Sequence, residues 1–322
     1  MHELEYVYAV ARIRSNENSL LNADKIEQLI NASDYAEALK KLGEIGYDVS
    51  NTTDVSEILL REQKKAWDLL VDIAPDKEKL EFLTVRNSFM NLKAALKSFV
   101  SGQKADEFLI QPANVPNEVI VKAVTEKDFS ILPEYMVDVA KESYEILTQK
   151  ADGQLSDTVI DKKSLETFLE FAKRLKNETL TRLADFTVAV ADMKIAYRAA
   201  LTGKDKEFLD AALAQCSAVD ISLLKRAALD GTEKVIDYIA RVGYKEAAEL
   251  LKESSVAFEK WCDDHIISAV ENAKYEAFGF LPLAGYYFAK ENEIKTVRIV
   301  MAAKENSLAP QIIRERVRRL YV

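Results

Sequence analysis

The chain has 322 residues, of which 48% are hydrophobic and 30% charged, and its formal net charge is −9 at pH 7. Nine glycines and six prolines are too few for the turns of a sandwich, a barrel or a doubly wound sheet, so an all-α fold is expected. The negative charge argues against nucleic acid as a partner. With only two cysteines there is no disulfide framework, which favours a reducing, cytosolic compartment.

Amphipathic helical patterns follow one another along most of the chain. The first clear one covers residues 55–73, after Asp54 and with Glu57 at the spacing of a capping box. Gly102 and Gly203 each follow a helical pattern at the position where a left-handed residue ends a helix. Further helices are expected over residues 80–100, 133–151, 164–201, 232–242, 254–278, 291–304 and 312–322, and only residues 111–116 resemble a linker.

The sequence predicts neither a signal peptide nor a membrane span. Glu3 and Glu5 stand where a signal peptide would be basic. The longest uncharged stretch, Ala277 to Ala289, has 13 residues and contains Pro282, whereas a spanning helix needs about 20. A soluble chain is therefore expected.

An internal repeat is the most informative feature of the sequence. Three stretches that begin at Asn91, Asp192 and Glu293 share the order polar, large apolar, Lys, any residue, small or branched apolar, and they lie 101 residues apart. A weaker similarity pairs residues 33–47 with 230–244. Amphipathic helices also resemble one another by chance, and that alternative stays open. The repeat predicts three units of about 100 residues, near 1–110, 111–215 and 216–322, with possible packing of the terminal segments together, and with Lys93, Lys194 and Lys295 in equivalent places.

Catalytic and metal motifs are scarce. Cys262 and His265 lie three residues apart on one expected helix, and His2 is the only other histidine. Zinc needs three or four converging ligands, so a partly buried histidine beside a small cysteine is the preferred interpretation. The sequence has no P-loop, no Gly-x-Ser-x-Gly and no His-Glu-x-x-His. We expect no catalytic residue, no cofactor site and no metal site.

Two segments could contact other molecules. The C-terminal segment carries Arg314, Arg316, Arg318 and Arg319, more cations than one helix dipole would explain. On an expected helix they would form two basic rows beside the apolar side chains, so we interpret them as an interface with acidic groups of a partner. The stretch 277–289 gathers five aromatic residues, which usually form core and in some proteins anchor an interface.

At four sets of residues, the chain resembles a known family, the C subunits of the V-type and A-type ATPases. This family is related to the d subunit of the eukaryotic vacuolar ATPase. The beginning of the chain resembles that of the family at Tyr6, Tyr8, Ala11, Arg12, Arg14, Leu20 and Leu21. The first repeat resembles that of the family at Arg86, Asn87, Asn91 and Leu92. Asp192-Met193-Lys194 resembles the second repeat, with Met in place of a commoner Asn-Leu pair. The third and most specific block comprises Phe278-Gly279, Pro282-Leu283, Tyr287, Ala289-Lys290-Glu291, Glu293-Ile294-Lys295 and Arg298.

The resemblance implies a fold and a role. The family has three similar helical subdomains around a pseudo-threefold axis, which form a funnel. Its members are non-catalytic central-stalk subunits, peripheral on the cytoplasmic face of the membrane. They receive the foot of the stalk's D subunit, with the F subunit nearby, and rest on the membrane ring of proteolipid subunits. They transmit torque between ATP turnover and proton or sodium transport.

Two other classes of protein remain as alternatives. One is an all-helical adaptor of another complex, although a 101-residue unit is far longer than the repeats of common helical solenoids. The other is a helical enzyme with a carboxylate or metal site, which the lack of Glu-x-x-His pairs disfavours.

Overall fold

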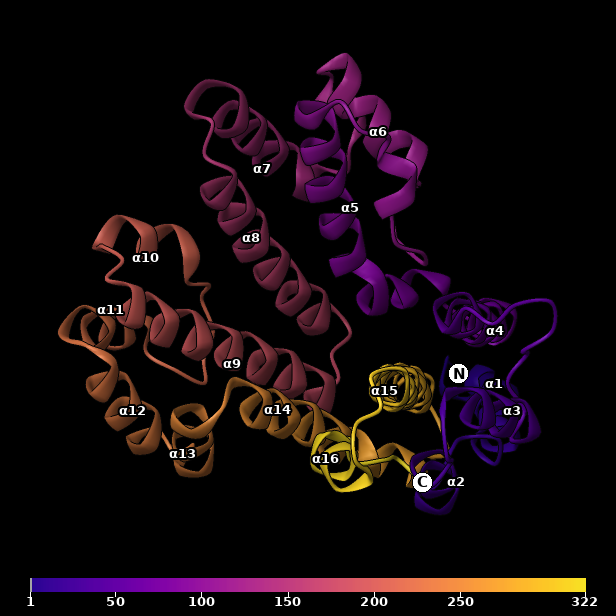
Figure 1. Cartoon of the computed structure of the whole chain (residues 1–322). Helices are drawn as coiled ribbons and strands as arrows, with labels where there is room; N and C mark the ends of the chain where they lie inside the picture. The colour runs from indigo at the N-terminus through magenta and orange to yellow at the C-terminus, as the bar shows by residue number, and fades with distance from the viewer. Residues whose placement is uncertain (1) are drawn as a thin grey trace. The chain divides into compact units, whose positions relative to one another are not determined.

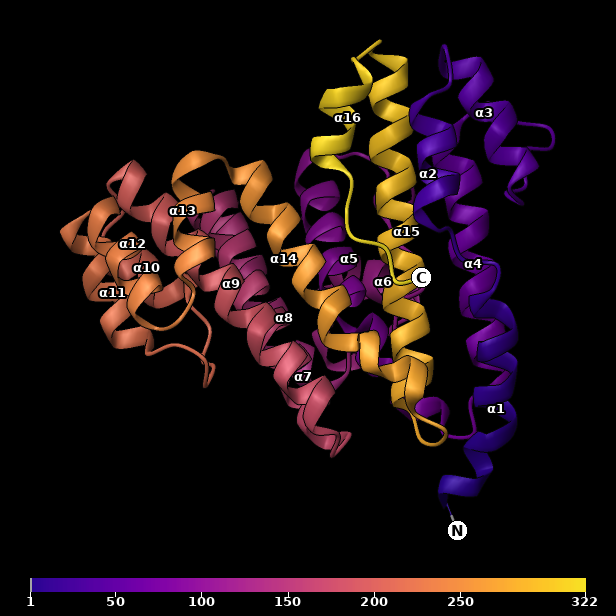
Figure 2. The ribbon, with the colours of Figure 1, turned by 90° about the horizontal axis from the view of Figure 1, so that it is seen from below.

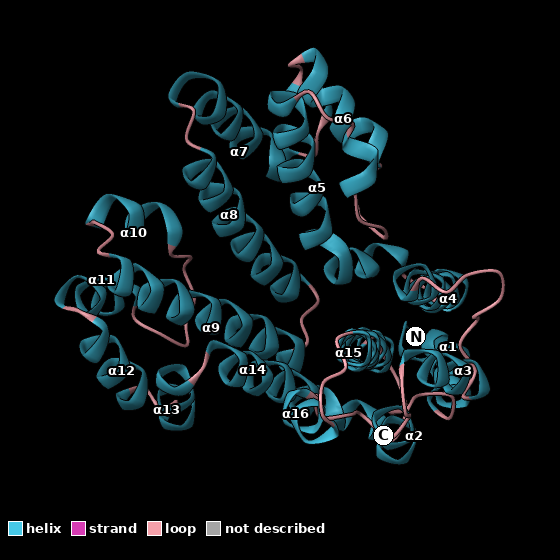
Figure 3. Cartoon of the chain, in the orientation of Figure 1, coloured by secondary structure: helices cyan, strands magenta, loops and turns pink. Residues whose placement is uncertain are grey.

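The computed structural model describes the backbone of residues 2–322 and the side chains of residues 5–105 and 107–322. Every regular element in the described chain is a helix (Figure 3). The prediction of an all-α fold is therefore confirmed for these residues. None of their helices is both long and apolar enough to cross a membrane.

The helices form two compact units, and the first one combines both ends of the chain. It contains the segments up to Leu80 and from Glu253 to Val322, whereas the second contains Glu81–Lys252. The first unit comprises α1 (His2–Glu17), α2 (Ala23–Ile30), α3 (Tyr35–Glu44), α4 (Val55–Ile73), the 3₁₀ helix η1 (Lys77–Leu80), α14 (Ser255–Val270), the 3₁₀ helix η5 (Glu271–Tyr275), α15 (Leu281–Glu305) and α16 (Pro310–Arg316).

Helix α15 is the centre of the first unit. Figure 1 looks along its axis, and α1, α2, α3, α4, α14 and α16 pack around it. Figure 2 shows α1 and α4 running along its length. Of its 25 residues, 18 are buried. A helix that is covered on most sides needs apolar residues all round, which explains why its sequence is not clearly amphipathic.

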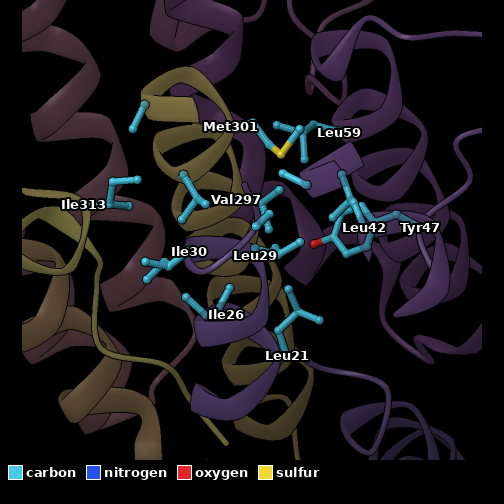
Figure 4. Close-up of a cluster of buried hydrophobic side chains, with 14 of the residues drawn as sticks. Leu21, Ile26, Leu29, Ile30, Leu42, Tyr47, Leu59, Val297, Met301 and Ile313 are labelled. Carbon is cyan, nitrogen blue, oxygen red and sulfur yellow. The ribbon is translucent and has the colours of Figure 1, made fainter. Parts of the chain in front are cut away.

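The main core of this unit joins residues that are far apart in the sequence. Leu21, Leu29 and Leu59 from the N-terminal segment pack with Val297 and Met301 of α15, and all five side chains are at most 1% exposed (Figure 4). Burial of each such side chain stabilises the fold by about 1.5–3 kcal/mol. The N-terminal helices therefore depend on α15 for their core.

The second unit is built on three long helices, α5 (Glu81–Ser101), α8 (Gly153–Arg174) and α9 (Glu178–Thr202). Helix α8 packs against both α5 and α9, and Phe82 of α5 stacks on Phe168 of α8 at 4.8 Å between ring centroids. Shorter helices complete this unit. They are η2 (Ala105–Phe108), α6 (Asn117–Glu126), η3 (Phe129–Ile131), α7 (Glu134–Glu145), the π-helical turn η4 (Ile146–Lys150), α10 (Lys206–Ala212), α11 (Ile221–Asp230), α12 (Thr232–Arg241) and α13 (Lys245–Glu253).

Several expected helix ends are confirmed. Asp54 is the N-cap of α4, and its side chain accepts a hydrogen bond from the Ser56 N–H. Gly102 and Gly203 have φ values of +71° and +64°, so both end their helices in the left-handed conformation that glycine adopts without steric cost. Residues 111–116 pack on α5, where Asn87 donates to the Pro112 carbonyl oxygen at 2.8 Å.

Several helix predictions are wrong in their extent. The helix expected over 291–304 begins at Leu281, and the α-helix expected over 254–278 ends at Val270. The single pattern expected over 164–201 is divided, because Lys176 has φ +54° and the Asn177 side chain caps a new helix. The helix expected over 312–322 ends at Arg316, and Val317 has extended backbone. Asn177 followed by Glu178 is the local signal for the first break, since asparagine is a strong N-cap residue.

Candidate functional site

A group of charged side chains is buried against α15. Lys290 Nζ lies 2.6 Å from Glu293 Oε1 and 3.5 Å from Glu62 Oε2 of α4. The Tyr47 hydroxyl donates to Glu293 Oε1 at 2.7 Å, and the Leu21 N–H donates to Glu293 Oε2 at 2.6 Å. We call Tyr47, Glu62, Lys290 and Glu293 the buried charge cluster. It ties α4 and two N-terminal loops to α15.

The buried charge cluster is sealed from solvent. Its four side chains are all buried. Burial raises the pKa of Tyr47, and the neighbouring Glu293 raises it further; burial also raises the pKa of Tyr286. Both tyrosines therefore stay neutral donors or acceptors. Because the members satisfy one another, the cluster is suited to fixing the position of α15 rather than to binding a ligand.

One member of this cluster could have been found in the sequence. Glu62 occupies a position on the apolar face of residues 55–73, where a carboxylate needs a buried partner. The partner itself lies 228 positions further along the chain, at Lys290, and no local pattern indicates which lysine it is.

Each of the three repeat stretches places a buried polar residue in the middle of a long helix. Asn91 of α5 accepts the Ile110 N–H at 2.7 Å and donates to the Ile110 carbonyl oxygen at 2.9 Å. Asp192 of α9 accepts the Ala214 N–H at 3.0 Å. Glu293 of α15 accepts the Leu21 N–H, as described above. We call Asn91, Asp192 and Glu293 the anchor residues, because each fixes a loop to its helix.

The lysines two positions beyond the anchor residues lie on the same three helices. Lys93 Nζ is 2.8 Å from Asp161 of α8, and Lys295 Nζ is 2.5 Å from Asp263 of α14. Lys194 lies half-buried on α9. Their equivalence in a threefold arrangement stays a prediction.

Three of the four C-terminal arginines make ion pairs within the chain. Arg318 is 6% exposed, and its Nε lies 2.8 Å from Asp263 Oδ2, the carboxylate that also binds Lys295. Arg319 Nη2 lies 2.8 Å from Glu271, and Arg314 Nε donates to Glu27 at 2.7 Å. The pairing with Arg314 lowers the pKa of the Glu27 carboxyl.

The fourth arginine, Arg316, differs from the others. It is exposed and makes no side-chain ion pair within the described part of the chain. Because α16 ends there, Arg318 and Arg319 follow on extended backbone, and the two helical rows expected from the sequence do not form. A role of the four arginines at an interface stays a prediction, and Arg316 is the member best placed for it.

The aromatic stretch 277–289 divides into a buried and an exposed part. Tyr286 and Tyr287 are buried on α15, as expected for core residues. Phe278 is 47% exposed in the loop before α15, and Tyr275 just ahead of it is 84% exposed. The exposed pair would suit contact with another molecule, although nothing else in this loop specifies one.

The described residues contain no group of three or more histidine, cysteine or carboxylate residues that could hold a metal ion. The His265 ring packs on Trp261 at 5.0 Å, Cys262 is half-buried, and the His2 side chain lies outside the described ones. Open hollows of about 430 Å³ and 390 Å³ lie over α6 and α5.

Comparison with known proteins shows the family of this chain. The model of the ATP synthase (C/AC39) subunit family matches residues 9–316, nearly the whole chain. The chain belongs to the ATP synthase (C/AC39) subunit family.

Curated relatives of this C/AC39 chain cover almost all of its length. It is 24% identical to the C subunit of the V-type sodium ATPase of Enterococcus hirae, over 99% of both chains. It is 23% identical to the C subunit of the A-type ATP synthase of Methanocaldococcus jannaschii, over 96% of this chain and 85% of the relative. The corresponding A-type ATP synthase protein of Thermococcus kodakarensis is also 23% identical, over 96% of this chain and 89% of the relative.

Proposed function

We propose that this chain is a non-catalytic rotor subunit of a V-type or A-type ATPase. It acts as the socket that links the D and F subunits of the central stalk to the proteolipid ring on the cytoplasmic face of the membrane. It transmits torque between ATP turnover and the transport of protons or sodium ions. The observation that carries the proposal is the family match over residues 9–316.

The internal packing is consistent with transmission of torque. A coupling subunit must resist deformation, and close-packed helices have low compressibility. The buried charge cluster links α15 to α4. The anchor residues fix the loop at Leu21 to α15, the loop at Ile110 to α5 and the loop at Ala214 to α9. Such links break only if a buried polar group loses its partner, which costs about 1–3 kcal/mol each.

We further propose that the chain is built from three similar units around a pseudo-threefold axis, in the shape of a funnel. The anchor residues support this, because each accepts a loop N–H in the middle of a long helix. A second similarity lies at the ends of α3 and α12. After α3, the Tyr47 N–H donates a hydrogen bond to the Leu42 carbonyl oxygen. After α12, the Tyr244 N–H donates in the same way to the Ile239 carbonyl oxygen. In both places the tyrosine follows a glycine with positive φ, +110° before Tyr47 and +101° before Tyr244. Electron microscopy of the assembled ATPase, which would reveal three lobes, tests it.

The role as a socket is tested by reconstitution. Membranes that contain the ATPase without this chain should hydrolyse ATP in the soluble head but pump no ions, and addition of the purified chain should restore pumping. The tagged chain should also recover the D and F subunits and the proteolipid ring from native membranes. Ion pumping that is unchanged without the chain, or recovery of none of those components, would contradict the proposal.

The contribution of Arg316 to assembly gives a narrower prediction. Arg316→Glu should leave the melting temperature unchanged, because the side chain is exposed and makes no internal ion pair. It should weaken binding to the D–F stalk or to the solubilised ring by about fivefold, since a surface ion pair is worth at most about 1 kcal/mol. The loss should be larger at low salt than at high salt, because salt screens the attraction.

Arg319→Glu is the matched control, because this side chain already binds Glu271 within the chain. The control should lower the melting temperature, whereas Arg316→Glu should not. If Arg316→Glu binds the stalk and the ring as tightly as the natural chain at low salt, Arg316 is not part of the interface.

A further inference from the structure

One anchor residue, Asp192, is incompletely bonded. Its side chain is fully buried in the middle of α9. Oδ1 accepts the Ala214 N–H at 3.0 Å, whereas Oδ2 is buried and has no hydrogen-bond partner. An ionised carboxylate carries charge on both oxygens, so a buried and unpaired oxygen is costly in that form. The arrangement therefore favours a proton on Oδ2.

The corresponding residue of α5 indicates what such a proton would do. Asn91 lies 101 positions earlier, and its amide accepts the Ile110 N–H and donates to the Ile110 carbonyl oxygen. A carboxyl group that holds its proton has one donor and one acceptor, as the amide does, whereas a carboxylate only accepts. Neutral Asp192 therefore still accepts the Ala214 N–H through Oδ1, and it leaves no unpaired charge on the buried Oδ2.

We infer that Asp192 is a proton-dependent latch, which in its neutral form fixes the loop of residues 213–220 to α9 and which loosens that loop when the proton leaves. The loop connects α10 to α11 and also contains Cys216. The inference concerns the isolated chain and does not depend on the proposed place in the ATPase.

The charged groups around the latch do not neutralise it directly. From α8, Lys162 donates to the Asp210 carbonyl oxygen at 2.8 Å, and from α11, Lys225 lies 2.8 Å from Asp210 Oδ1. Glu166 of α8 adds a like charge nearby, and Cys216 faces the group from the loop. On α9 itself, Asp185 accepts the Ser217 N–H at 2.7 Å and the Ser217 hydroxyl at 2.8 Å.

These surroundings place the proton exchange near neutral pH. Burial is the main cause that raises the pKa of Asp192 to about 7; the Ala214 N–H and the charges of Lys162 and Lys225 oppose it, and Glu166 adds to it. The pKa is about 3.8 for an unperturbed aspartate. Between pH 4 and pH 7, the folded chain keeps the Asp192 proton, whereas the unfolded chain loses it. The contribution of Asp192 to the free energy of unfolding therefore falls as the pH rises from about 4 to about 7, and it is constant above that.

Thermal unfolding of the full chain between pH 5.5 and pH 8 tests the latch. Asp192→Asn keeps a donor and an acceptor but does not titrate, so its melting temperature should fall less with rising pH than that of the natural chain. At pH 8 the variant should melt at the higher temperature. Asp185→Asn is the matched control, because it removes a charge two turns away on α9 and leaves Asp192 in place; it should retain the natural pH dependence.

Hydrogen exchange gives a second measurement that needs no variant. The Ile110 N–H is held by an amide that does not titrate, so it serves as an internal reference for the Ala214 N–H. The ratio of exchange at Ala214 to exchange at Ile110 should rise by up to about tenfold between pH 6 and pH 8. A constant ratio, or equal pH slopes for the natural chain and Asp192→Asn, would overturn the inference.

Discussion

Replacement of Lys290 by methionine should lower the free energy of unfolding by about 3–5 kcal/mol, since removal of one partner leaves a buried charge without compensation. Lys290 is 5% exposed and is the cation that faces both Glu62 and Glu293 in the buried charge cluster. Methionine has a similar length and volume, so the loss reports the charge more than the packing. Denaturant unfolding followed by circular dichroism measures it.

Lys65→Met is the control for this experiment. Lys65 lies 3.4 Å from the same Glu62, but its side chain is 72% exposed, so its removal should cost less than about 1 kcal/mol. The double variant Glu62→Gln, Lys290→Met should recover part of the loss, because one of the two buried carboxylates is then neutral. Equal stabilities of the Lys290→Met and Lys65→Met variants would show that the cluster is not desolvated as described.

Replacement of Gly285 by alanine should also destabilise the chain, because α15 packs closely at this position. A Cβ there would lie 2.6 Å from the Ala273 Cβ and 3.3 Å from the Tyr321 hydroxyl oxygen. Overpacking of this kind costs about 1–3 kcal/mol, and the better helix propensity of alanine offsets up to about 1 kcal/mol. The change in melting temperature measures the net effect.

Ala273→Gly in the same chain should restore most of that loss, since it removes the atom in the closest contact. Gly153→Ala is the matched control, because its Cβ would meet only Leu147 Cδ2, at an ordinary 3.9 Å. The control should be neutral or stabilising by up to about 1 kcal/mol. The explanation by overpacking fails if Ala273→Gly does not rescue Gly285→Ala.

Local features of the fold were largely predictable from the sequence. Gly102, Gly203 and Asp54 end or begin helices where the pattern indicated, because these signals act within a few residues. The division at Asn177 was missed because apolar periodicity continues through it. The end of α16 at Arg316 was missed because the next residues are held by distant partners, Asp263 and Asp264, rather than by their own helix.

The polar interior could be predicted only in part. The repeat drew attention to Asn91, Asp192 and Glu293, but not to the loops that they hold. Glu293 binds Leu21, which precedes it by 272 positions, and no spacing rule relates the two. Arg318 was expected to face a partner, and its burial against Asp263 follows from packing between α14 and the C-terminal segment.

The joining of both chain ends in one unit affects the order in which the protein can fold during its synthesis. The core around Leu21, Leu29 and Leu59 includes Val297 and Met301, so the N-terminal side of this core leaves the ribosome long before its native neighbours are made. At about 5–20 residues per second, translation from Leu59 to Val297 takes on the order of ten to fifty seconds. Residues 81–252 form a separate compact unit and can fold during that time. Until α15 is made, the apolar faces of α2, α3 and α4 lack their native cover, so we expect chaperones to bind this part of the nascent chain.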